Sequence, residues 1–520
     1  MTSMNRISSA INAHTLIEQA QVMIGSVEQA YRRGQAVHEV EQELFKQALE
    51  LGRLGLGLFF ELCGDGDRGE RVQLGDGREV NRLEAKHYRE YQSVFGLYEL
   101  ERVVYGSREG QKIEYVPLDD QLQLPQGKFS YLLQDWNQSL AVGSPYGTVD
   151  ATLEKMLDFS QSVHSLERGN EQLSASVGEF WEARLPGPEA QGEEIVVATV
   201  DGKGVVMRKA KPEPEEAKAG QCESVREADT SEEDQPKGRK KMAVIGSAYT
   251  IAPYVRTPEE VLEALFRTPK APGEEAVEPR PKPLAKAIRA SLRRDEEDTL
   301  KPAYDEIFGW LAEEVCHRRA EGPRATVLLM DGQKSLWTAG KTHLGKESPI
   351  EILDLLHANS YVWKAAALLY PEAKAEALIF FVKPRIKRLL NGEVEGVIQG
   401  LRSMGTRRGL KGERLKKLTQ VCAYLQNNAH RMRYDEYLAA GYPIASGVIE
   451  GACRHVIKDR MERSGMRWTL SGAQSMLSLR CIYLNGDWEA YMKFHIAKET
   501  RRLYPYRTAN DDDNGLAQVA

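Results

Sequence analysis

Apolar runs rich in β-branched residues recur through the middle of this chain, and three of them carry an aspartate. They are EIVVATVDGKGVVMRKA with Asp201, ATVLLMDGQKSLW with Asp331, and SPIEILDLLHANSYVW with Asp354. Short apolar runs bounded by Gly and Pro are typical of buried strands. We expect Asp201 to end a strand that is followed by a tight Gly turn and a returning strand, and MAVIGSAYTI to form a third strand. The sequence therefore predicts a sheet with carboxylates at strand ends.

Helical patterns flank these strands. Apolar residues from Val40 to Leu54 recur at spacings of three and four, which predicts amphipathic helices over residues 15–62. The residues after the Pro-rich stretch TPKAPGEEAVEPRPKPLAK also read as helical, up to about Arg319, and residues 359–440 are almost entirely helical in pattern. Strands that alternate with helices place the central part of the chain in the α/β class.

Two segments have more specific patterns. Residues 94–116 read as a strand pair joined at the turn SREG, and the polar residues 211–241 read as a disordered loop. A short helix near Leu153 and a longer one from Val163 to Phe180 suit a helix-turn-helix that reads DNA, or equally two packed helices with no such role.

The length of 520 residues predicts several domains, because single domains run to about 150 residues. The N-terminal part is expected to hold a helical region (1–90), then a strand pair with a helix-turn-helix-like DNA-binding region (91–187). The predicted sheet would form the first part of a core (188–358), which a helical insertion (359–440) separates from its completion, a segment with a helix that carries Glu450 (441–495). A tail (496–520) follows.

Composition excludes several classes of protein. With 28% charged residues and no apolar stretch of the roughly 20 residues that span a bilayer, no membrane protein is expected. The N-terminus lacks a secretory signal pattern, which predicts a cytoplasmic location. The six cysteines lie far apart without a C-x-x-C pair, so we expect them to be reduced and structural.

Charge is unevenly distributed. The formal net charge is 70 minus 76, or −6, yet between Lys383 and Lys417 eleven Lys or Arg stand against three Glu, an excess of eight. Such a run predicts either a phosphate-binding face or a solvated helical surface. If the run is a phosphate-binding face, neutralising Arg385, Lys387 and Arg388 would weaken DNA binding and flatten the dependence of that binding on salt. The candidate DNA-binding residues of this run are Lys383, Arg385, Lys387, Arg388, Arg407 and Arg408.

Carboxylates at the ends of elements could support metal chemistry. Asp201 and Asp331 are expected to end strands, and Glu450 stands at the start of a helix in YPIASGVIEGACRHVIKDRMERSGMRW. Mg²⁺ prefers oxygen ligands, and two such ions about 4 Å apart promote in-line phosphoryl displacement. Three acids that lie together could hold that pair. Each has an ordinary alternative, which is an Asp-Gly turn for the aspartates and a favourable dipole interaction for Glu450.

The helix that begins near Glu450 is unusually basic. Arg454 and Lys458 lie four and eight residues beyond Glu450, on roughly the same face, which predicts a phosphate-binding ridge beside the acid. Arg467 and Trp468 suit stacking on an exposed base, and the alternative for Trp468 is core packing. The basic residues of this segment are Arg454, Lys458, Arg460, Arg463 and Arg467.

These stretches resemble the DDE transposases of bacterial insertion sequences, specifically the ISKra family. The similar stretches are VATVDGKGV, VLLMDGQKSLW, ILDLLHANSYVWKAA and ASGVIEGACRHVIKDRMERSGMRW followed by SGAQSML, and the resemblance covers the chain from about residue 90 to 480. It implies a multi-domain α+β protein with a ribonuclease H-like α/β catalytic core, a large helical insertion and a mainly helical N-terminal region. It also implies that Asp201, Asp331 and Glu450 are the catalytic, metal-binding acids, with Asp354 as the alternative second ligand.

The resemblance further implies a nucleoid-associated endonuclease and strand transferase that uses two Mg²⁺ ions, for which Mn²⁺ can substitute. Its partners would be double-stranded DNA, namely terminal inverted repeats recognised by the N-terminal region and target DNA, and the complex would be a homo-oligomer. His357 is similar to a histidine that would contact DNA near the scissile phosphate, or it packs at a strand end. Two alternatives stay open: a ribonuclease H-like nuclease or resolvase without strand transfer, and an inactive, domesticated DNA-binding protein.

Overall fold

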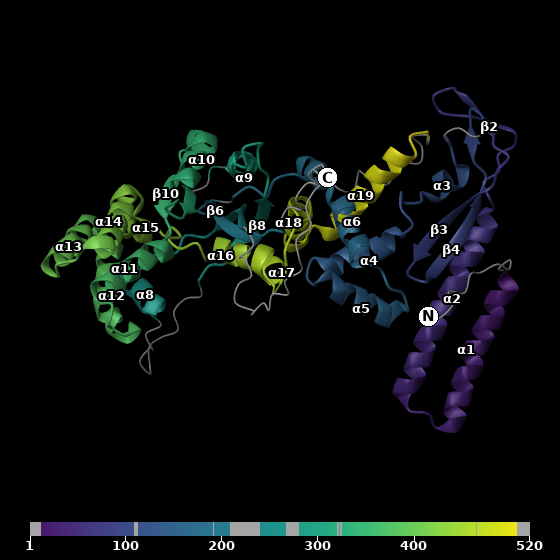
Figure 1. Cartoon of the computed structure of the whole chain (residues 1–520), viewed down its shortest axis with the longest axis horizontal. Coiled ribbons are helices and arrows are strands. Elements are labelled where there is room, and N and C mark those ends of the chain that lie inside the picture. The colour runs from purple at the N-terminus through teal and green to yellow at the C-terminus, as the bar shows by residue number, and fades with distance from the viewer. Residues whose placement is uncertain are drawn as a thin grey trace, which may run out of the picture. The chain divides into compact units, whose positions relative to one another are not determined.

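The computed structural model of the protein describes residues 12–108, 113–190, 192–208, 240–266, 280–319, 322, 325–463 and 465–506. The chain forms two compact units, one of Met1–Arg184 with Gly486–Ala520 and the other of Leu185–Asn485 (Figure 1). The predicted disordered loop at 211–241 lies outside the described residues except for Lys240 and Lys241, and residues 507–520 of the predicted tail lie outside them as well.

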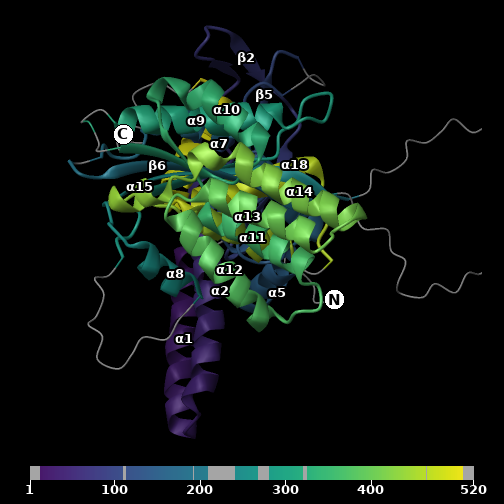
Figure 2. The same cartoon turned by 90° about the vertical axis from the view of Figure 1, so that its left-hand side faces the viewer.

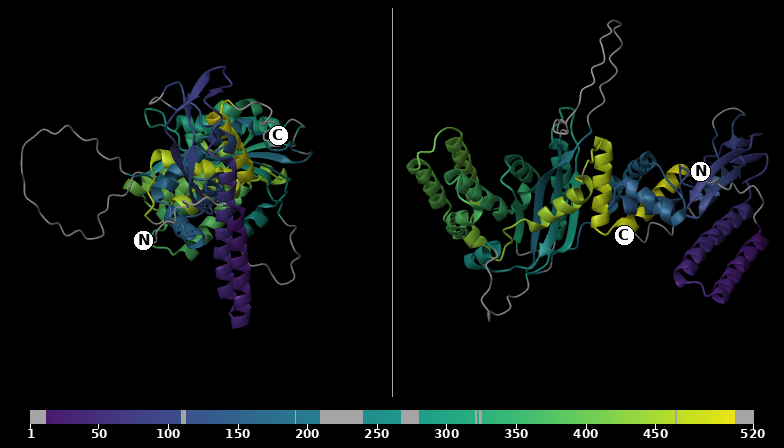
Figure 3. Two further views of the ribbon diagram at one scale, coloured as in Figure 1. Left: turned by 90° about the vertical axis from the view of Figure 1, so that its right-hand side faces the viewer. Right: turned by 60° about the horizontal axis from the view of Figure 1, so that its bottom comes forward.

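The first unit is mainly helical and contains two small antiparallel sheets, one in the order β1-β2-β5 and the other of β3 and β4. Helices α1 and α2 run side by side as a hairpin (Figures 1 and 3). The elements are α1 (Ala13–Arg33), α2 (Val37–Cys63), β1 (Arg71–Gln73), β2 (Glu79–Arg82), β3 (His87–Ser93), β4 (Gly96–Arg102), β5 (Tyr105–Gly106), α3 (Pro117–Leu122), α4 (Tyr131–Ala141), α5 (Tyr146–Leu157), α6 (Val163–Ser174), α7 (Val177–Ala183) and α19 (Trp488–Leu503).

The longer strand pair of this unit lies earlier in the chain than predicted. β3 and β4 pair in register up to Ser93 opposite Gly96, so their turn falls between these two residues. Across SREG, Tyr105 and Tyr115 form an isolated antiparallel bridge. Gly96 has a φ of 142°, which favours glycine, and the register directs Tyr98 inward, where its hydroxyl donates to the Arg53 carbonyl of α2 at 2.9 Å. Burial against α2 therefore selects this register. Residues 109–112, at the predicted turn, lie outside the described part of the chain.

Other boundaries in this unit also differ from the predicted ones. The predicted helical region 1–90 contains β1, β2 and the start of β3, and the predicted longer helix from Val163 to Phe180 is two helices, α6 and α7. Helix α19 crosses the predicted boundary at residue 496. None of the helices in the described ranges has the length and apolar character needed to cross a membrane.

The second unit is a mixed α+β structure around a five-stranded sheet. The sheet has the order β10-β9-β6-β7-β8, in which β6, β7 and β8 are antiparallel neighbours and β6, β9 and β10 are parallel (Figure 3, right). Its strands are β6 (Ile195–Val206), β7 (Lys240–Ile251), β8 (Leu284–Ser291), β9 (Ala325–Met330) and β10 (Ile350–Leu353).

Helices cover both faces of this sheet because side chains alternate along each strand. Val196, Ala198 and Val200 of β6 pack against α9 and α10, whereas Val197 and its neighbour Val327 pack against the helical segment α11–α15. Figure 2 shows α11–α14 packed together. The helices are α8 (Pro258–Phe266), α9 (Lys301–Arg318), α10 (Lys334–Leu344), η1 (Gly345–Glu347), α11 (Leu355–Leu369), α12 (Ala375–Leu390), α13 (Val394–Arg407), α14 (Gly412–Asn427), η2 (Ala429–Arg431), α15 (Tyr434–Ala439), α16 (Gly447–Cys453), the π-helical turn η3 (Arg454–Lys458), α17 (Asp459–Met461) and α18 (Leu470–Leu484).

Two strand predictions in this unit need correction. β6 continues through Asp201-Gly202 without a turn, because Gly202 and Gly204 stay in the ladder opposite Val244 and Met242 of β7. Asp201 therefore lies inside a long strand. Residues 284–291, which read as helical, form β8, because this segment pairs with β7 and places Ile288 and Ala290 in the core. Pairing with a long neighbouring strand outweighs the helix propensity of its Ala, Lys and Arg residues.

Candidate functional site

The aspartates singled out in the sequence come together at one edge of the parallel part of the sheet. β6 pairs with β9 up to Val200 opposite Met330, and β10 pairs with β9 up to Leu353 opposite Met330. The next residues on the three strands are Asp201, Asp331 and Asp354, so register alone places these acids side by side. Asp201 and Asp331 also share the sheet face of Val197 and Val327, because alternate residues point to one face.

Glu450 is brought to the same place by α16. Cys453 lies one helical turn beyond Glu450, on the same face, and its thiol donates a hydrogen bond to the Asp201 carboxylate at 3.4 Å. The start of α16 is held by Ser446, whose backbone N–H and hydroxyl both donate to the Asp354 carboxylate. The chain after α17 pairs with the end of β6, where the Trp468 N–H donates to the Val206 carbonyl at 3.0 Å. The segment carrying Glu450 is thus anchored to the sheet at both ends.

The helix that follows Glu450 is interrupted by a π-helical turn at Arg454–Lys458. Arg480 of α18 donates to the carbonyls of His455 and Val456, which stabilises the widened turn. Arg454 and Lys458 are exposed, and Arg454 pairs with Asp459 at 3.6 Å. Single-turn π-helices are frequent at functional sites.

Neighbouring carboxylates affect the ionisation of two of the four acids, Asp331 and Glu450. Burial raises the pKa of Asp331, and the charges of Asp201 and Asp354 raise it further, while the Gln333 N–H and the charge of His357 oppose the rise. Burial likewise raises the pKa of Glu450, with Asp354 and Asp201 adding to it and His357 opposing it. Burial and the nearby carboxylates thus both favour the protonated forms of Asp331 and Glu450.

Asp354 has a different environment from the other acids. It is fully buried and caps α11, where its Oδ1 accepts from the Leu356 N–H at 2.9 Å and its Oδ2 contacts His357 Nδ1 at 2.9 Å. With Ser446, these donors occupy both carboxylate oxygens. The hydrogen bond that His357 donates to the Asp354 carboxylate raises the pKa of His357, and the charges of Asp331 and Asp201 act in the same direction against burial. His357 lies in the first turn of α11, not at a strand end.

The raised pKa of Asp331 predicts the effect of its neutralisation on stability. A carboxyl whose pKa is raised in the folded state contributes stability that is present below its unfolded pKa and is lost as pH rises through the folded pKa, so ionised Asp331 destabilises the protein at neutral pH. Asp331→Asn is therefore expected to raise the midpoint of thermal unfolding at pH 7 in EDTA, and to have little effect at about pH 3. A lower midpoint at pH 7 would contradict this. Glu313→Gln, at an exposed position of α9, is the matched control.

The groups at this site are carboxylate oxygens, which are the ligands that hard divalent cations prefer. Their negative charges repel each other. Among the described residues, no three His, Cys, Asp or Glu side chains lie close enough together to hold one metal ion. Mg²⁺ does not need three protein side chains around one ion, because it is usually bound by one or two carboxylates and completes its coordination with water and substrate phosphates. Asp201 is near both of the other acids, because its charge raises the pKa of Asp331 and that of Glu450.

The basic side chains at the start of the run contact other residues of the protein. The Arg385 guanidinium lies 3.4 Å from the ring centroid of Phe381, Lys387 pairs with Glu259 at 2.8 Å, and Arg388 pairs with Glu393 at 2.7 Å. The remaining predicted residues are Lys383, 5.9 Å from the ring centroid of Phe266, Arg408, 3.8 Å from that of Tyr370, and Arg407, which is exposed.

The residues predicted to contact DNA at the end of the basic helix differ in their exposure to solvent. Arg467 is exposed, but Trp468 is only 8% exposed, and its indole N–H donates to the Met461 carbonyl at 3.2 Å. Arg460 is buried with its guanidinium 5.1 Å from the centroid of the Trp468 ring, so it belongs to the core and not to a surface ridge. The position of Trp468 agrees with core packing and leaves no open ring for a base.

Sequence reasoning missed several residues that shape the site. Trp337 donates its indole N–H to the Asp331 backbone carbonyl at 2.6 Å, and Ser446 and Cys453 bind Asp354 and Asp201. Burial and the Asp201 charge raise the pKa of Cys453, so its thiol stays protonated. The spacing of Cys453 three residues after Glu450 was the one local signal that could have indicated a shared face.

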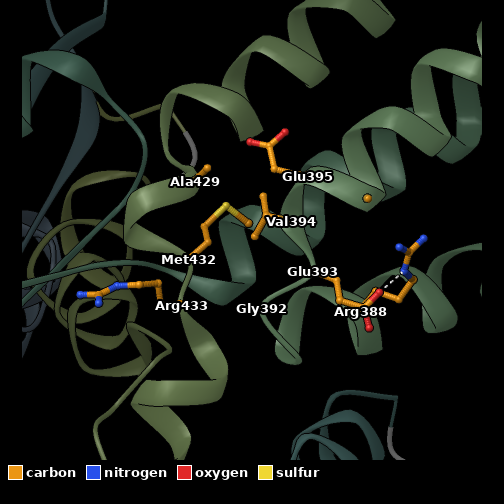
Figure 4. Close-up of a pocket in the computed structure, with 9 residues that line it drawn as sticks. Arg388, Gly392, Glu393, Val394, Glu395, Ala429, Met432 and Arg433 are labelled. Carbon is orange, nitrogen blue, oxygen red and sulfur yellow. Dashed lines mark hydrogen bonds and ion pairs between the residues drawn. The ribbon is translucent and has the colours of Figure 1, made fainter.

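A separate cavity of about 390 Å³ lies among the helices α12, α13 and α15 (Figure 4). Its arginines are paired, Arg388 with Glu393 and Arg433 with Glu436, and Glu395 accepts a hydrogen bond from Gln426. None of the acids of the sheet edge lines it. The cavity is thus distinct from the candidate site.

Comparisons with known proteins add little. No family model and no curated protein matches the sequence. Among solved structures, the chain is similar to one described as the Drosophila P element transposase strand transfer complex, at 11% identity and a TM-score of 0.19, with 76% of this chain and 90% of that chain covered. A likeness with so low a TM-score carries no argument about fold or function.

Proposed function

We propose that this chain is a DDE transposase of an insertion sequence, of the kind that its sequence resembles in the ISKra family. The observation that carries the proposal is the convergence of Asp201, Asp331 and Glu450, which are far apart in the sequence, at one edge of the sheet. The order of the sheet, with three antiparallel strands and then two parallel to the first, supports a ribonuclease H-like core. The helical segment between Asp331 and Glu450 supports the proposed insertion.

In the proposed reaction Asp201, Asp331 and Glu450 would hold two Mg²⁺ ions. Such ions activate the attacking oxygen and stabilise the leaving oxygen of an in-line phosphoryl displacement. The chain itself contributes the fixed spacing of Asp201 and Asp331 through the β6–β9 register, and the anchoring of α16 through Ser446. We assign Asp331 as the second acid, because hydrogen bonds occupy both oxygens of Asp354.

The proposed substrate is double-stranded DNA, first the terminal inverted repeats and then the target. Arg454, Lys458 and Arg467 are exposed on the segment that follows Glu450, which suits contacts with phosphates beside the acids. A charged His357 held by Asp354 would add a further cation there. Because transposition joins two ends to one target, we propose a homo-oligomer in the DNA complex.

The proposal is tested with the purified full chain and DNA carrying the ends of its own element. Nicking or cleavage that requires Mg²⁺ or Mn²⁺ and stops with EDTA is expected, together with joining of pre-cleaved ends to a target plasmid. Cleavage without joining would identify a ribonuclease H-like nuclease or resolvase. Specific binding with neither reaction would indicate an inactive, domesticated protein.

Exposed cations of the helical segment are expected to set the salt dependence of DNA binding. Arg407, Lys411 and Lys417 are exposed, whereas Lys387 and Arg388 are paired with glutamates. Replacing the first three by Ala should reduce the slope of log K against log salt by roughly 2 to 3, since each lost phosphate contact removes about 0.9. Lys387→Ala with Arg388→Ala should change the slope less, and equal slopes for both sets would contradict this assignment. Fluorescence anisotropy at several salt concentrations measures it.

A further inference from the structure

Two tyrosines of the helical segment stack directly beside the candidate site. The rings of Tyr361 in α11 and Tyr424 in α14 have centroids 3.6 Å apart and planes inclined by 3°. Burial raises the pKa of both hydroxyls, and the charge of Asp331 adds to the rise at each. The pair therefore lies within electrostatic reach of the second acid.

Tyr424 also touches the turn that carries Asp331. A Cβ placed on Gly332, the residue after Asp331, would lie 2.5 Å from both Cζ and Oη of Tyr424, and closer still to Cε2. Real Cβ atoms do not approach other atoms so closely, so the ring occupies the space that any side chain at position 332 would need. Gly332 is required here by this close approach and not by its φ, which lies outside the left-handed region.

A second contact links the end of the helical segment to the same turn. The Arg431 guanidinium of η2 lies 4.0 Å from the centroid of the Trp337 ring and pairs with Glu351 at 2.6 Å. The Trp337 indole in turn donates to the Asp331 carbonyl. Both Tyr424 and Trp337 therefore contact the Asp331-Gly332 turn.

The tyrosine pair is not an open platform for a DNA base. One face of Tyr361 is covered by Tyr424, and the Lys364 ammonium lies 4.1 Å from the centroid of the same ring. A stacked base needs a free ring face. The geometry favours a role inside the protein.

We propose that Tyr424 is a positioning residue: its ring, packed on Gly332, holds the turn that places Asp331 for the reaction proposed above. The inference rests on the proposed function and deepens it, because it makes the helical segment part of the catalytic geometry as well as a DNA-binding surface. Displacing a reacting group by about 1 Å can lower a rate 100-fold. The contact is therefore expected to affect cleavage more than DNA binding.

The test changes the size of the side chains at positions 332 and 424, alone and together. Gly332→Ala forces the turn away from the ring, and cleavage of element ends is expected to fall about 100-fold. Tyr424→Ala alone should lower cleavage about 10-fold, whereas in the Gly332→Ala background it should raise cleavage about 10-fold, because it removes the clash. Tyr424→Phe keeps the ring and should retain most of the activity. Gly400→Ala, in α13 where nothing lies within 4 Å of the new methyl group, is the matched control.

Two further measurements do not depend on cleavage. The changes in unfolding free energy for Gly332→Ala and Tyr424→Ala should be non-additive, because the residues touch. Titration with Mn²⁺ alone, followed by electron paramagnetic resonance, should show weaker binding in Gly332→Ala and recovery in the double variant.

The outcomes separate the inference from the proposed function. A wild-type chain that neither cleaves nor binds Mn²⁺ would refute the proposed function, whatever the unfolding data show. A wild-type chain that cleaves, with Gly332→Ala equally active, would refute the positioning role alone. Additive unfolding energies would also refute it, because they would mean that the ring and the turn are not in contact. The positioning role would be supported if Tyr424→Ala lowered cleavage in the wild-type chain and raised it in the Gly332→Ala background.

Discussion

Replacing Asp201, Asp331 or Glu450 by its amide is expected to abolish DNA cleavage and to spare DNA binding. The amide keeps the size and one oxygen of each side chain but removes the charge that a divalent cation requires. Loss of one preorganised electrostatic group typically lowers a rate by 100- to 1000-fold, and loss of a metal ligand should reach at least about 1000-fold. Binding is expected to stay constant or to strengthen, because a negative charge near the DNA backbone is removed.

The measurement is cleavage of a labelled duplex with an element end, alongside fluorescence anisotropy of the same duplex. Glu313→Gln is the isosteric control, since Glu313 is exposed on α9, which packs on the sheet face opposite Asp201. An amide variant that cleaves within about 10-fold of the wild type would exclude that residue from the metal-binding set. Loss of DNA binding together with cleavage would indicate a folding defect and not a lost ligand.

Asp354→Ala is expected to have the largest effect on stability. The substitution removes the cap of α11, worth about 1 kcal/mol, and leaves Ser446 and His357 without their buried partner, at about 1 to 3 kcal/mol. A loss of about 3 kcal/mol from the second unit is expected. Since the chain has two units, amide hydrogen exchange at the start of α11 and around Ser446 should accompany the unfolding curve.

The stability changes discriminate between the two candidates for the second acid. Asp331→Asn should stabilise the protein at pH 7 and abolish cleavage, whereas Asp354→Ala should destabilise it. Asp354→Asn keeps the shape of the cap and should lower the pKa of His357, which the Asp354 carboxylate now raises. NMR titration of His357 measures this. If Asp354→Asn abolished cleavage without changing stability or the His357 titration, Asp354 would replace Asp331 as the second ligand.

Local patterns in the sequence predicted much of the helical structure and several strands. The helical run over 359–440 appears as α11–α15, and the apolar run before Asp331 is β9. Glu450 lies in the first turn of a helix, as predicted. These features follow from periodicity and capping, which depend on neighbours a few residues away. Asp331 and Glu450 could be singled out for the same reason, since Asp331 follows a strand and Glu450 lies in the first turn of a helix.

Where the predictions differed, a distant partner decided the structure. β6 continues past Asp201 because β7, beyond residues 209–239, pairs with it along its whole length. Residues 284–291 are a strand because β7 has a free edge that they complete. Arg460 faces the core, although the basic sequence around it suggested a surface, and Trp468 is buried as in the core-packing alternative.

By itself the sequence singled out the acids that we propose to carry the chemistry and predicted much of the structure around them, because side-chain type and local periodicity are properties of short segments. Only the tertiary structure decided that Asp201, Asp331 and Glu450 are neighbours, that Asp354 is occupied by Ser446 and His357, and that Tyr424 lies on Gly332. The reason is physical: strand register and helix packing are set by burial of whole faces against distant partners, and no short segment records which partner it will meet.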